Sequence, residues 1–69
     1  MENFKEGQLV YVYDGDLIGF TFATLTKRID VLEKDVLERW QITTLEGYKL
    51  VRFIKNEKEF KKDGCGYIV

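Results

Sequence analysis

Residues 26–44 read TKRIDVLEKDVLERWQITT, and the division of this stretch between helix and strand decides the fold. One interpretation is an amphipathic helix, because apolar residues recur at the spacing of a single helical face. Asp30 and Glu33 would then form a capping box that starts the helix near Val31. The apolar face of that helix would consist of Ile29, Leu32, Val36, Leu37 and Trp40.

The other interpretation divides the same stretch into a β-hairpin. The second strand would run on to about Ile29, residues 33–35 would form a polar tip, and a third strand would cover about 36–44. The tip contains neither Gly nor Asn, which is unusual for a tight hairpin. We favour the hairpin because Trp40 and Ile42 lie in a β-prone run, and no glycine ends a helix directly before it. A short helix within 30–40 remains the alternative.

Two strands are predicted before this stretch. Residues 9–13 are strongly β-prone, with Val10 and Val12 on one face and an equally apolar second face, so the strand is expected to be covered on both sides. The turn sequence Asp14-Gly15-Asp16 precedes a second strand over residues 17–25. Gly19 within that strand predicts a bulge or sharp bend of the kind that curls a small barrel.

Two further strands are predicted after it. The turn at Glu46-Gly47 leads into a strand over residues 48–54, and residues 67–69 form a short closing strand. Between them lies the polar stretch 55–63, with Phe60 as its apolar anchor and room for a helical turn. The chain is therefore expected to form a single small domain over 1–69, mainly β, with five strands.

This order of elements resembles a known architecture. Gly7-x-x-Val10-x-Val12, a bend at Gly19, Trp40-x-Ile42, Gly47 and a strand ending near Phe53 are similar to the small bent five-stranded barrels of the SH3-like (Src-homology-type) class. KOW, Sm-like and Tudor modules share that architecture. The resemblance covers most of residues 4–60 and implies a binding domain. The Pro-binding grooves of true Src-homology domains are not recognisable in this sequence.

The composition argues against most enzyme classes. The 69 residues include no His, no Ser and a single Cys, so the usual general base and the usual nucleophile–base pairs are missing. We expect a protein that is not an enzyme and carries neither cofactor nor metal, since Asp14 and Asp16 offer too few ligands for Ca²⁺. Cys65, between two glycines and near Lys61 and Lys62, is either a reactive thiol or, by default, a small core residue.

The sequence also suggests where the protein is found. No apolar run approaches the ~20 residues of a membrane span, and residues 1–6 lack the basic start and apolar stretch of a signal peptide. One unpaired Cys is typical of a reducing compartment, so we expect a cytoplasmic protein. A short, lone barrel of this kind fits a viral or prophage (phage) accessory protein.

The leading functional hypothesis is a protein-binding module that docks through an exposed aromatic or apolar strand face. Tyr11, Tyr13 and Tyr48 are the candidate anchors, because exposed tyrosines dominate many protein interfaces. The partner is an unknown protein or a second copy in a homodimer, since both faces of the first strand are apolar.

The alternative is a nucleic-acid-binding module with a basic face. Residues 1–48 carry 5 Lys and Arg against 9 Asp and Glu, whereas residues 49–69 carry 6 against 3. Cations interleaved with aromatic residues are typical of proteins that contact phosphates and stack bases. The candidate residues are Lys27, Arg28, Lys49, Arg52 and Lys55.

Overall fold

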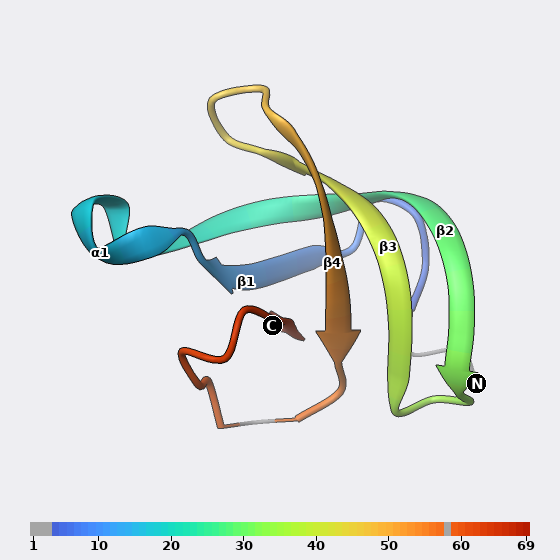
Figure 1. Ribbon diagram of the computed structural model, residues 1–69. Coiled ribbons are helices and arrows are strands. Elements are labelled where there is room, and N and C mark those ends of the chain that lie inside the picture. Colours follow the sequence, from blue (N-terminus) through green and yellow to red (C-terminus); the bar gives the residue numbers. More distant parts are fainter. Residues whose placement is uncertain (1–3, 58) are drawn as a thin grey trace.

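A computed structural model describes residues 4–57 and 59–69, and five strands in them close into a barrel with the order β1-β2-β3-β4-β5 (Figure 1). Each strand is antiparallel to its neighbours except β5, which runs parallel to β4. The mainly β, five-stranded barrel predicted from the sequence is thus confirmed. The elements are β1 (Leu9–Tyr13), α1 (Gly15–Ile18), β2 (Phe20–Glu33), β3 (Leu37–Thr44), β4 (Lys49–Lys55) and β5 (Gly66–Ile68).

The hairpin interpretation of residues 26–44 is confirmed, and a helix within 30–40 is wrong. β2 runs to Glu33 and β3 begins at Leu37, with the turn closed by a 3.0 Å hydrogen bond from Val36 N–H to the Glu33 carbonyl oxygen. Asp35 replaces the missing glycine by adopting a φ of 65°. Every second residue of β3 is buried, a period of two that no helix could give.

The strand β2 is shared by the two halves of the barrel. Its first residues pair with β1, from Phe20 opposite Tyr13 to Thr24 opposite Leu9, and from Ala23 onward it pairs with β3. Three register shifts interrupt the second part, and such β-bulges increase local twist and bend a strand. β2 therefore curves around the barrel, as Figure 1 shows, and connects both halves through one continuous backbone.

The predicted start of the second strand is wrong. Residues 15–18 form the single helical turn α1 instead, and the strand begins at Phe20. Gly15 and Gly19 have φ angles of 80° and 73°, a region that glycine adopts without strain. Asp14 N–H donates to the Gly19 carbonyl oxygen at 2.8 Å and closes the loop. Gly19 thus ends α1, and the bend of β2 comes from the later bulges.

The interior of the barrel is filled by alternate side chains of the strands. The buried cluster consists of Phe4, Val10, Val12, Ala23, Leu25, Trp40, Ile42 and Ile54. Gly66 of β5 lies against this cluster so closely that a Cβ atom there would be 2.7 Å from Ile54 Cδ1 and 2.9 Å from Val12 Cγ1. Any larger residue would overpack the junction of β5 with β1 and β4.

Candidate functional site

A charged network lies at the end of the barrel next to the N-terminal segment. Glu38 is buried on the inner face of β3, and its Oε1 accepts a hydrogen bond from Trp40 Nε1 at 2.8 Å and from Arg28 Nε at 2.9 Å. Arg28 also donates through Nη2 to the Phe4 carbonyl oxygen at 2.9 Å, and its guanidinium lies 5.1 Å from the centre of the Trp40 ring. Arg28 therefore holds the N-terminal segment to the barrel.

A second charged network fixes the segment between β4 and β5. Asp63 accepts hydrogen bonds from the Tyr67 hydroxyl at 2.6 Å, from Lys55 Nζ at 2.9 Å and from the Cys65 backbone N–H at 3.1 Å. The Tyr67 hydrogen bond, more than any other contact, holds the pKa of Asp63 far below its ordinary value. Burial, reinforced by the bond to Asp63, raises the pKa of Tyr67 to about 12.

The environment of Cys65 does not favour a reactive thiol. The side chain is half-buried, and burial raises its thiol pKa above the ordinary value, with the nearby Asp63 carboxylate adding to the effect. A thiolate is the reactive form, so this environment lowers its reactivity at neutral pH. The structural interpretation of Cys65 is therefore the better one.

The three tyrosines predicted as protein-binding anchors do not form one surface. The Tyr11 ring packs between Phe20, Phe22 and Phe60, with ring centres 4.8–5.0 Å apart. Tyr13 also packs against Phe20, at 5.3 Å. Tyr48 lies in the connection between β3 and β4 and is 68% exposed. Tyr11 and Tyr13 belong to an aromatic layer on the outer face of β1, and this layer covers that face as expected.

The five candidate nucleic-acid residues are also dispersed. The cations of Arg28 and Lys55 are paired with Glu38 and Asp63. Arg52 lies on the inner side of β4, half-buried, and donates to the Val51 carbonyl oxygen at 2.9 Å. In the described part of the chain, Lys27 and Lys49 are the two of the five that make no ion pair or hydrogen bond through their side chains.

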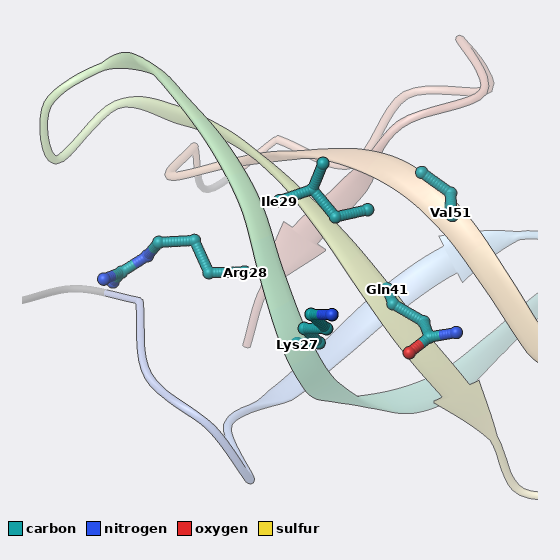
Figure 2. Close-up of a pocket in the computed structure, with 5 residues that line it drawn as sticks. All are labelled: Lys27, Arg28, Ile29, Gln41 and Val51. Atoms are coloured by element: carbon teal, nitrogen blue, oxygen red, sulfur yellow. The ribbon is translucent and has the colours of Figure 1, made fainter.

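A hollow of about 430 Å³ lies on the outer face of the sheet formed by β2, β3 and β4 (Figure 2). Its lining follows from the register, because Lys27, Gln41 and Val51 are successive cross-strand partners and form one row across the three strands. Ile29 is the extra residue of a β-bulge between Arg28 and Asp30. In Figure 2 the Arg28 side chain points away from Gln41 and Val51, so the apolar part of the lining consists of Ile29 and Val51, on either side of Gln41.

The residues around the hollow differ in charge and polarity. Ile29, Val51 and the neighbouring Phe53 are exposed apolar side chains. Lys27 contributes an unpaired ammonium group, whereas Arg39 in the next row is paired with Asp30 at 3.0 Å. Among the lining residues and their described neighbours in 4–57 and 59–69, the site thus combines two apolar side chains with the unpaired ammonium of Lys27, an arrangement suited to an apolar ligand that carries a negative group.

Ile29, Gln41 and Val51 were not predicted as site residues from the sequence. The period-two alternation of the third and fourth strands could have indicated that Gln41 and Val51 face away from the core, but the bulge that brings Ile29 beside them leaves no sequence signal. Among residues 4–57 and 59–69, no group of three His, Cys, Asp or Glu side chains is arranged to hold a metal ion. No helix in those ranges has the length and apolarity needed to cross a membrane.

Comparisons of the chain with models of protein families, with curated proteins and with solved structures give no match. A functional proposal for this barrel therefore rests on the geometry of its surface.

Proposed function

We propose that this chain is a non-enzymatic protein-binding domain, and that its binding surface is the hollow on the outer face of β2, β3 and β4. The observation that carries the proposal is the row formed by Lys27, Gln41 and Val51 with Ile29 beside it. A depression with exposed apolar side chains on the face of a sheet is a common docking place for a partner's side chains.

The chemistry of the hollow selects the kind of partner. Ile29 and Val51 favour aliphatic side chains, because burying apolar surface from both sides is the main source of affinity in such contacts. The unpaired Lys27 favours a carboxylate next to those side chains, and it disfavours a cationic segment. The expected ligand is a short acidic and aliphatic segment of a protein.

The tyrosines are weaker candidates for the contact surface than the sequence implied. Tyr11 and Tyr13 already pack against phenylalanine rings, so truncating either one would remove stabilising contacts of the free domain. Tyr48 is exposed but lies outside the hollow. We therefore place the partner contact on β2, β3 and β4 instead of β1.

The proposal is tested by NMR titration with blocked tetrapeptides that contain two aliphatic residues. An acidic peptide, with aspartate at both ends, is compared with a basic one that has lysine at both ends. We expect the acidic peptide to shift the amide signals of Ile29, Gln41 and Val51 and the basic peptide to leave them unchanged. Lys27→Glu should reverse this preference, and Lys49→Glu, on the same sheet face but outside the hollow, is the matched control.

Either of two results would contradict the proposal. Equal shifts of these amide signals with both peptides would exclude charge selection by Lys27. Shifts confined to the aromatic layer around Tyr11 would show that the peptides bind at β1. A mixed pool of single-stranded oligonucleotides in the same titration tests the alternative function. Binding that falls steeply as salt rises, and that Lys27→Glu and Lys49→Glu both weaken, would favour a nucleic-acid-binding module.

We also propose that the barrel belongs to the SH3-like architecture. The order of five strands, a bent β2 that pairs with both β1 and β3, and a short β5 beside β1 support this assignment. An experimentally determined structure that superposes on such barrels strand by strand would test it. A different strand order would refute it.

A further inference from the structure

The turn α1 presents apolar side chains that the barrel does not use. Leu17 is fully exposed and Ile18 is 60% exposed, although both are among the most apolar residue types. Figure 1 shows α1 projecting at one end of the molecule, beyond the start of β2. Leu17 and Ile18 are adjacent on a projecting turn and are therefore a candidate contact with another molecule.

The sequence of this turn matches the ligand expected for the hollow. Residues 14–19 read DGDLIG and contain two carboxylates, two aliphatic residues and no cation. The hollow offers the complement: the aliphatic side chains of Ile29 and Val51 and, among the described residues, the unpaired ammonium of Lys27. Its volume of about 430 Å³ is within the usual range of ligand pockets, roughly 300–1,000 Å³, and so admits two aliphatic side chains.

One molecule cannot fill its own hollow with its own turn. Phe20 follows α1, and Lys27 lies further along the same strand β2, where an extended chain covers roughly 20 Å between them at about 3.3 Å per residue. The strand also carries α1 away from the β3 and β4 face in Figure 1. Any contact between the turn and the hollow must therefore join two molecules.

We infer that the partner recognised by the hollow is a second copy of this chain, which inserts Leu17 and Ile18 of its α1 turn. This inference rests on the proposed function of the hollow. The inferred contact is head-to-tail, so each bound pair keeps one free turn and one free hollow, whereas a reciprocal exchange of turns would close as a two-fold dimer. Copies joined head-to-tail therefore add in the same direction, into a ring or an open filament.

The test measures assembly by sedimentation velocity over a range of protein concentrations. We expect the wild-type chain to form dimers and larger species as concentration rises. Leu17→Asp removes the inserted side chain, and Lys27→Glu repels the acidic turn. Each should weaken self-association by about tenfold or more, the size expected when a central contact is lost. Leu45→Asp is the matched control, an exposed leucine in the β3–β4 connection, outside both surfaces.

Mixing the two variants distinguishes a head-to-tail contact from other modes of association. The Leu17→Asp chain keeps its hollow and the Lys27→Glu chain keeps its turn, so the mixture should form 1:1 dimers that grow no further. A symmetric interface that uses neither the turn nor the hollow would not be restored by mixing, and a reciprocal two-fold exchange of turns would give wild-type dimers that grow no further. Because the restored contact needs a folded hollow in one chain and a folded turn in the other, dimer formation also shows that both variants are folded.

The results separate this inference from the proposed function. A wild-type chain that stays monomeric, or that associates equally well with Leu17→Asp, overturns the inference. If the acidic peptide still binds the hollow in that case, the proposed function stands and the partner is a different protein. If neither the peptide nor a second copy binds, both proposals fail.

Discussion

The barrel contains two charged networks that perform the same task in different surroundings. Glu38 joins the N-terminal segment to the barrel through Arg28, and Asp63 joins the β4–β5 connection to the barrel through Tyr67 and Lys55. The Glu38 side chain is 6% exposed, whereas that of Asp63 is 31% exposed. Water can replace a lost partner at Asp63 but not at Glu38, so the larger number of hydrogen bonds to Asp63 does not imply a larger contribution to stability.

The largest effect is expected from Glu38→Ala. This change leaves the buried Trp40 N–H without an acceptor and the Arg28 guanidinium without its carboxylate, at a cost of about 2–3 kcal/mol in the free energy of unfolding. Glu38→Gln keeps an oxygen for Trp40 and should cost only about 1 kcal/mol. Urea unfolding followed by Trp40 fluorescence measures both. Equal losses would show that the indole hydrogen bond contributes nothing.

A smaller effect is expected from Asp63→Ala. The variant removes the acceptor shared by Tyr67, Lys55 and Cys65, and we expect a loss of about 1 kcal/mol because water reaches the site. Amide hydrogen exchange should accelerate over residues 59–65 and stay unchanged in β3. Glu57→Ala is the control in the same connection, since its 3.9 Å pair with Lys61 is exposed and should change stability by less than about 0.5 kcal/mol. A loss of stability as large as that of Glu38→Ala would show that the difference in exposure between the two networks does not set their contributions.

The smallest effects are expected from titration of the Asp63 network. Because the folded pKa of Asp63 is depressed, its contribution is present above the ordinary aspartate pKa of about 4 and is lost as pH falls through the lower folded value. The stability difference between wild type and Asp63→Asn should therefore shrink steadily as pH is lowered below about 4. A difference that is constant down to the lowest pH at which the barrel folds would contradict this assignment.

At alkaline pH, the contribution of Tyr67 to stability changes in the opposite direction, because it is lost as pH rises. The folded pKa of Tyr67 is raised to about 12, so its contribution is complete below the ordinary tyrosine pKa of about 10 and is lost as pH rises through 12. Tyr67→Phe should remove this part of the pH dependence of stability. The part that comes from the raised pKa of Lys55 should remain. Ultraviolet absorbance of tyrosinate in wild type and variant measures the titration directly. Tyr67 ionising near 10 would show that the hydrogen bond to Asp63 does not persist in solution.

Only part of the fold and of the candidate site could be predicted from this sequence. The β-prone run at Trp40 and Ile42, with no glycine to end a helix directly before it, correctly favoured the hairpin. The start of the second strand was predicted wrongly, because Leu17 and Ile18 are residue types typical of strands. The positive φ angles of the flanking Gly15 and Gly19 turn them outward instead. The hollow depends on a bulge at Ile29, which follows from pairing across strands instead of from local sequence preference. The roles of Arg28 and Lys55 likewise depend on partners distant in sequence.

The closure of the barrel depends on a very short strand. The three residues of β5 pair with β1 on one side and β4 on the other, through Val10 opposite Ile68 and Ile54 opposite Gly66. If β5 frays, two strand edges become available at the same moment, each with unpaired backbone donors and acceptors. A strand from a neighbouring chain could then take the vacant place. Exchange of β5 between molecules is therefore the expected first consequence of weakening this element.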